Sequence, residues 1–210
     1  MKKLFYLLPL NLIILSCGIV ENDEPEPEST ADEIIAMGWM NFESGLYQDA
    51  IGDFNDALIK DPSALEAYSG LGWSYIRINS IENAESNFLT ALNENYAGVE
   101  MLAGLSAISL AWGQYLDAIE YAEAVISVNS AWVFEHDSNI NFKDIWYIAA
   151  IAYFHEGELD EVESAILHID NGFSIFADDP STWVLNEQVF DTYIEVIAAY
   201  LQNLSSELII

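Results

Sequence analysis

The sequence predicts an all-α chain in which antiparallel helical hairpins stack into a solenoid of about four repeats, followed by a C-terminal helical element. Two observations carry this prediction. Small and large apolar residues recur at a period of about 34 residues, and within each copy they keep the three-and-four spacing of an amphipathic helix. The composition agrees, since 52% of the 210 residues are hydrophobic, which is enough to build a core.

Five positions define the repeat. The first copy carries Gly38, Ala50, Phe54, Ala57 and Pro62, and the second carries Gly72, Ala84, Phe88, Ala91 and Tyr96 in the same register. The third copy keeps Ser106, Ala118, Ala122 and Val125, and a fourth with Trp146, Ala149, Ala150 and Tyr153 follows a ten-residue insertion. Small residues let two helices approach closely, while large ones fill the space between hairpins that cannot bury their faces alone.

This pattern resembles the tetratricopeptide repeat, best in the second copy, which has Tyr68, Leu71, Gly72, Tyr75, Ala84, Phe88 and Ala91. The resemblance places the repeats at 31–64, 65–98, 99–132 and 143–170. It implies helices near 31–44, 47–60, 65–78, 81–94, 99–112, 115–128, 142–156 and 159–169. Turns that tolerate positive φ are expected at Gly45, Asn79, Gly113 and Gly157.

Two segments do not fit the repeat. The stretch from Ala131 to Asn141, which contains the insertion, is predicted to be a loop, as is 170–181. The segment 171–210 is predicted to consist of a loop and a C-terminal capping helix near 182–204, because its apolar residues again follow a helical stripe.

The first sixteen residues have the features of a secretory signal: Lys2 and Lys3, then an apolar stretch too short to span a bilayer. Ser16-Cys17, preceded by Ile14-Leu15, resembles the lipobox of bacterial lipoproteins. By that resemblance Cys17 is lipidated after cleavage. The competing interpretation, an ordinary small residue in a secretory signal, is less favoured because the chain has no other cysteine.

Residues 17–30 form an acidic, proline-containing segment without an apolar face, which predicts an extended tether of about 40 Å. Gly18, rather than an aspartate, follows the cysteine. By resemblance to lipoprotein sorting, this favours the outer membrane, on either its periplasmic or its surface-exposed side.

The family resemblance also implies a binding site, because the first helix of each hairpin lines a concave groove in tetratricopeptide proteins. The corresponding residues are Ile35, Trp39, Phe42, Trp73, Ile76, Arg77, Leu110, Tyr147 and Phe154. Trp39 and Trp73 occupy the same repeat position, so we expect their rings side by side on one wall, and partly exposed if the groove is open. Such an aromatic floor suits an apolar peptide or an amphipathic helix.

Several arrangements of this groove stay open at the level of sequence. It is either open to a partner, filled by the C-terminal helix, or buried in a homo-oligomer. Should the groove not be the binding surface, the Trp132–His136 part of the insertion is the next candidate. The acidic positions along the groove rule out the Lys- and Arg-based clamp with which some relatives grip carboxylate tails.

Charge and motif content exclude other functions. The formal net charge of −30 excludes nucleic acid as a partner. No catalytic, phosphate-binding, metal-binding or cofactor motif occurs, and His136, His155 and His168 are scattered in the sequence. We therefore expect a non-enzymatic scaffold that binds a protein or peptide in the cell envelope. The alternative is a glycan- or nutrient-binding outer-membrane lipoprotein.

Overall fold

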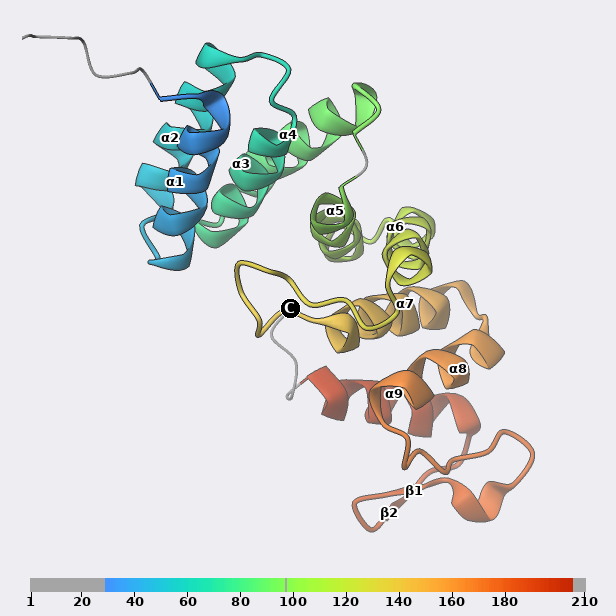
Figure 1. Ribbon diagram of the computed structural model, residues 1–210. Helices are drawn as coiled ribbons and strands as arrows, with labels where there is room; N and C mark the ends of the chain where they lie inside the picture. The colour runs from blue at the N-terminus through green and yellow to red at the C-terminus, as the bar shows by residue number, and fades with distance from the viewer. Residues whose placement is uncertain (1–28, 97, 206–210) are drawn as a thin grey trace, which may run out of the picture.

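The structure is a computed structural model that describes residues 29–96 and 98–205 (Figure 1). The predicted signal peptide, Cys17 and nearly all of the tether lie outside the described residues. The helices of the repeats are α1 (Ala31–Glu43), α2 (Tyr47–Lys60), α3 (Glu66–Arg77), α4 (Ile81–Asn93), α5 (Val99–Ala111), α6 (Tyr115–Val128), α7 (Phe142–Glu156) and α8 (Leu159–Ile169).

These helices pair as four hairpins, α1 with α2 through α7 with α8, and the hairpins follow one another in chain order in Figure 1. The predicted all-α solenoid is confirmed. The helix bounds agree with the prediction to within a residue or two at each end, and Gly45, Asn79, Gly113 and Gly157 all adopt positive φ, from 59° to 82°. None of the described helices combines the length and the apolar character needed to cross a bilayer.

Glycine spacing sets how closely the first two repeats pack. The fully buried ring of Phe88 lies where side chains at Gly72 and Gly104 would be, since a Cβ atom added at these positions would approach it to 2.2 Å and 2.6 Å. The ring of Phe54 takes the equivalent place between Gly38 and Gly70. Each phenylalanine therefore packs against its own hairpin and the next one.

The third repeat packs with a smaller residue at the phenylalanine position and a larger one at the glycine position. Ala122 stands at the position of Phe54 and Phe88, and the buried Ser106 stands at the glycine position. The Ser106 hydroxyl donates to the Ala103 carbonyl oxygen at 2.8 Å, so the buried polar group is satisfied within its own helix.

The C-terminal segment differs from the prediction. Residues 182–192 are not α-helical: a 3-10 turn, η1 (Pro180–Thr182), leads into an antiparallel pair, β1 (Val184–Leu185) and β2 (Gln188–Val189), and only then does α9 (Tyr193–Ser205) begin. The two residues between the strands, Asn186 and Glu187, both have positive φ, as a two-residue hairpin with right-handed strand twist requires.

Helix α9 packs against the last hairpin of the repeats. Its Val196, Ile197 and Leu201 are almost completely buried, and it packs against α7. Two tyrosines of α9 also donate hydrogen bonds to the preceding part of the chain. The Tyr193 hydroxyl donates to the Glu163 carboxylate, and the Tyr200 hydroxyl donates to the Asp170 carboxylate. Burial and the hydrogen bond to Glu163 raise the pKa of Tyr193.

Candidate functional site

The loop between α6 and α7, residues 131–141, packs against α1 and α3 on the face where the family resemblance implies a groove. In Figure 1 this loop, drawn in yellow, extends from α6 toward the N-terminal hairpins before the chain enters α7. Its central side chain, Phe134, has no exposed surface. The Phe134 ring stacks on Trp73 at 4.4 Å between ring centroids and meets the edges of Trp39 and Phe42 at 6.1 Å and 5.9 Å.

The loop has regular backbone pairing of its own. The Phe134 N–H donates to the Ile140 carbonyl oxygen at 2.9 Å, and the Phe142 N–H donates to the Trp132 carbonyl oxygen at 2.7 Å. Side chains alternate between core and solvent, with Trp132, Phe134 and Ile140 buried. The loop is thus a narrow hairpin whose apolar side chains point into the groove.

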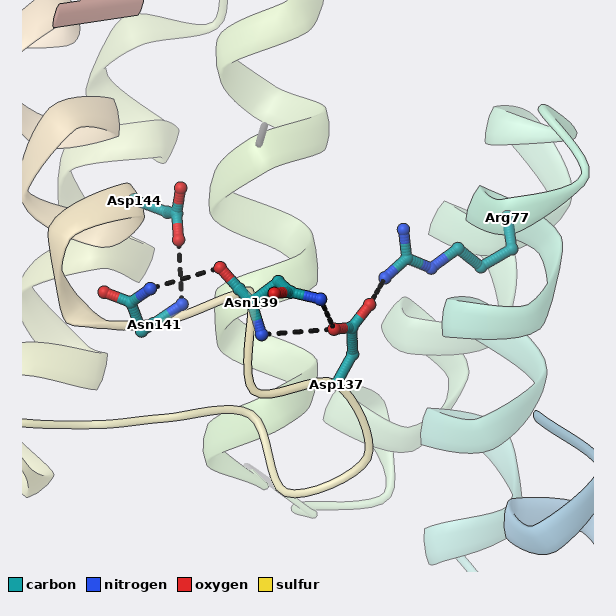
Figure 2. Close-up of polar contacts among 5 residues, drawn as sticks. All are labelled: Arg77, Asp137, Asn139, Asn141 and Asp144. Atoms are coloured by element: carbon teal, nitrogen blue, oxygen red, sulfur yellow. Dashed lines mark hydrogen bonds and ion pairs between the residues drawn. The ribbon is translucent and has the colours of Figure 1, made fainter. Parts of the chain in front are cut away.

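Polar contacts fasten the loop to the first two repeats. Arg77 of α3 forms an ion pair with Asp137, whose other carboxylate oxygen accepts from the backbone and side-chain amides of Asn139 (Figure 2). The loop then joins α7 through a capping box, in which the Asn141 side chain accepts from the Lys143 N–H and the Asp144 carboxylate accepts from the Asn141 N–H. These bonds run from α3 to α7 without a break in Figure 2.

His136 provides a second attachment, on α1. Its imidazole lies parallel to the Trp39 indole at 3.7 Å between centroids, and its Nδ1 is 2.8 Å from the Glu43 carboxylate. The other two histidines also stack on an aromatic ring, His155 on Tyr115 at 4.1 Å and His168 on Trp146 at 3.9 Å. Each of the three histidines thus stacks on a different aromatic ring, and they do not form a cluster.

Most of the groove residues predicted in the first two repeats are buried. The rings of Trp39, Phe42 and Trp73 were expected to be partly exposed if the groove is open, but their exposed fractions are 6%, 3% and 3%. Ile35 is also buried, and Ile76 and Arg77 are half-buried. The physical reason is the Phe134 side chain, which occupies the space that a partner was expected to fill.

The C-terminal half of the predicted groove lies farther along the solenoid. Leu110 of α5 and Tyr147 and Phe154 of α7 are half-buried. Ser205, at the end of α9, lies near the Tyr147 hydroxyl. At the two tryptophans it is the insertion, and not the C-terminal helix, that covers the predicted groove residues.

An open pocket of about 320 Å³ remains beside the insertion. It lies along α1 and is closed on its sides by Glu66 of α3 and His136 of the insertion. Of the residues predicted for the groove, only Ile35 and Trp39 contribute to it. The complete lining is Asp32, Ile35, Ala36, Trp39, Met40, Glu43, Glu66 and His136.

The chemistry of this pocket is acidic and apolar. Three of its eight lining residues are carboxylates, and none is lysine or arginine. Among the residues that the structure describes, no group of three or more His, Cys, Asp or Glu side chains is arranged to hold a metal ion. The pocket is suited to recognising a ligand by charge and apolar contact.

Sequence reasoning missed Phe134, His136 and Asp137 as the residues that fill and fasten the groove. A signal was present, because Trp132, Phe134 and Ile140 give the insertion more apolar surface than an exposed loop needs. The pairing of Asp137 with Arg77 could not be found in this way, since the two lie 60 positions apart.

Solved structures give the comparison for this fold. YrrB, described as a TPR protein with an unusual peptide-binding site, is 21% identical over 82% of this chain and 78% of its own, with a TM-score of 0.58. MamA is 22% identical over 66% of this chain and 70% of its own, with a TM-score of 0.53. A tetratricopeptide repeat protein from Parabacteroides merdae is 13% identical over 84% of this chain and 60% of its own, at 0.54.

The fold is that of the tetratricopeptide-repeat proteins. At these identities the likeness concerns the fold and not the function. No protein-family model and no curated protein matches the sequence. The function must therefore be argued from the concave face of this chain itself.

Proposed function

We propose that this chain is a non-catalytic interaction module, lipid-anchored in the bacterial cell envelope, that binds a protein or peptide at the pocket between α1 and the insertion. The observation that carries the proposal is this pocket, which stays open where the insertion leaves the concave face of α1 uncovered. Its volume of about 320 Å³ is at the small end of the range for ligand pockets. It has room for one or two side chains of a partner rather than for a whole helix.

The energetics of the insertion favour the pocket over the filled part of the groove. A partner that displaced Phe134 would have to offset the loss of its burial and of its aromatic contacts, about 3–5 kcal/mol. At about 1.4 kcal/mol per factor of ten, this lowers the partner's affinity by at least about a hundredfold. The loop is therefore proposed to be a fixed wall of the binding site.

The glycan-binding alternative gains no support from this face. Sugar recognition would use the exposed face of an aromatic ring, but Trp39 and Trp73 are 6% and 3% exposed. The His136 imidazole already covers one face of the Trp39 indole.

In-cell photo-crosslinking tests the interaction. A photoreactive residue at Met40, which lines the pocket and is 66% exposed, should form crosslinks to a discrete protein partner. The same residue at Ile59 of α2, which is 80% exposed and outside the pocket, is the matched control and should not. Absence of Met40-specific crosslinks, or identical products from both sites, would reject the proposed surface.

The membrane anchor rests on the residues around Cys17 and is tested separately. Labelled palmitate should enter the wild-type protein, and Cys17→Ala should yield a soluble or uncleaved form. A Cys17→Ala variant that stays in the outer-membrane fraction at unchanged mass would contradict the anchor. The proposed outer-membrane location follows from Gly18 and is tested by the same fractionation.

A further inference from the structure

We propose that the partner presents a lysine or arginine side chain to the pocket beside α1. This inference rests on the proposed function and names the chemistry of the partner at that same site.

The pocket runs along one face of α1. Asp32 and Glu43 lie at its two ends, and since they are eleven positions apart the rise along the helix is about 16 Å. Ala36 and Met40 lie between these carboxylates on the same helical row. A partner segment lying along α1 would pass an apolar strip with a negative charge at each end.

Two of the three carboxylates are held in place by aromatic side chains. The Trp39 Nε1–H donates to the Glu66 carboxylate at 3.2 Å, and the His136 ring nitrogen lies 2.8 Å from Glu43. The indole donor is neutral, so it orients Glu66 without cancelling its charge. The Glu43 side chain stays half-exposed and can accept a further donor.

The floor of the pocket suits the aliphatic part of a long basic side chain. Met40 is 66% exposed, and its flexible thioether adapts to differently shaped partners. Lysine and arginine cover apolar surface with their methylene groups while the charged end reaches a carboxylate. An acidic partner segment would face three like charges with no lysine or arginine in the lining.

The charge of the whole chain points the same way. A formal net charge of −30 attracts basic partners from a distance and raises their rate of association. This general attraction falls off within about 10 Å at 0.1 M salt, so it cannot select one face. A test must therefore separate the pocket carboxylates from the overall charge.

The probe is an unstructured Gly-Ser peptide with a central Leu-Lys-Lys-Leu segment, titrated into methyl-labelled protein at physiological salt. Binding should shift the Met40 methyl resonance. Met37, which lies in the same helix, is half-exposed and is not part of the lining, should not respond. Acetylation of the two peptide lysines should weaken binding by at least tenfold.

Matched charge variants complete the experiment. Glu43→Gln with Glu66→Gln keeps both oxygen acceptors but removes two charges from the pocket, and should weaken peptide binding by at least tenfold. Glu82→Gln with Glu120→Gln removes two charges from exposed positions of α4 and α6, and should change it less than threefold. Equal losses in the two double variants, or undiminished binding of the acetylated peptide, would overturn the proposal.

This result can be separated from a failure of the proposed function. If Met40 crosslinks to a partner in cells while the lysine peptide does not bind, the pocket is an interaction site and its partner is not basic. If Met40 gives no specific crosslinks, the proposed function fails, and with it the assignment of a basic partner.

Discussion

At the scale of single residues, the glycines at the hairpin crossings determine how closely the helices pack. Gly72 is required because a side chain there would enter the Phe88 ring, whereas Gly52, exposed within α2, has nothing within 4 Å of an added Cβ atom. A side chain is therefore expected to destabilise the protein at Gly72 and to stabilise it at Gly52. Only Gly72 belongs to the repeat pattern.

Substituting both glycines tests this difference. Gly72→Ala should lower the free energy of unfolding by about 1–3 kcal/mol, because the added methyl group overpacks the crossing. Gly52→Ala should raise it by about 0.5–1 kcal/mol, because alanine loses less backbone entropy in a helix. Chemical denaturation measures both values. Similar effects of the two substitutions would show that the repeat register is wrong.

A second residue-scale feature is the carboxylate of Asp170. The Tyr200 hydroxyl and, to a lesser extent, the Gly172 backbone N–H lower the pKa of Asp170 below its usual value. A lowered pKa means that the folded state favours the ionised carboxylate. The resulting stability is present above the unfolded-state pKa of about 3.9 and is lost as the pH falls through the folded-state value.

Tyr200→Phe should therefore raise the Asp170 pKa toward its usual value. The stability difference between this variant and wild type should be largest near neutral pH and should shrink below about pH 4. NMR titration of the Asp170 carboxyl carbon measures the pKa, with Tyr75→Phe in another repeat as the control. An unchanged Asp170 pKa in Tyr200→Phe would refute the assigned hydrogen bond.

Among the elements, the repeat helices could be predicted from the sequence, but the place of the insertion could not. The repeat positions predicted the eight repeat helices because Gly38, Phe54 and their equivalents act through local, periodic packing. The last helix was placed too early because Leu185, Val189 and Tyr193 are spaced by four. That spacing fits one face of a helix, but also one side of an extended chain. The insertion was predicted as a loop, but its place in the groove depends on contacts with distant residues.

The central side chain of the insertion tests its structural role. Phe134→Ala should lower the free energy of unfolding by about 3–5 kcal/mol, because it leaves a cavity among Trp39, Phe42 and Trp73. Val133→Ala, at an exposed neighbour in the same loop, should stay within about 0.5 kcal/mol of wild type. Equal and small effects of the two substitutions would mean that the loop does not contribute to the core.

At the scale of the whole molecule, the excess of acidic residues opposes compaction. The sequence contains 35 Asp and Glu against 5 Lys and Arg. Of the basic residues, Arg77 is engaged with Asp137 inside the groove. Folding brings the remaining like charges closer together, so self-repulsion should reduce stability when salt is low.

Salt should therefore stabilise the protein. Raising sodium chloride from about 0.01 M to about 0.5 M shortens the screening length several-fold, and the Tm should increase. Scanning calorimetry at fixed pH measures the change. A Tm that falls or stays constant would show that stabilising ion pairs outweigh the repulsion among the carboxylates.

Phe134 packs among Trp39, Phe42 and Trp73 in place of a partner, and the pocket beside α1 stays open. A nuclear Overhauser measurement between the ring protons of Phe134 and the indole of Trp73 tests it most directly, because their ring centroids are 4.4 Å apart. We expect strong cross-peaks in the free protein, unchanged when a partner occupies the pocket. A free protein without these cross-peaks would mean that the groove is open and that the insertion does not occupy it.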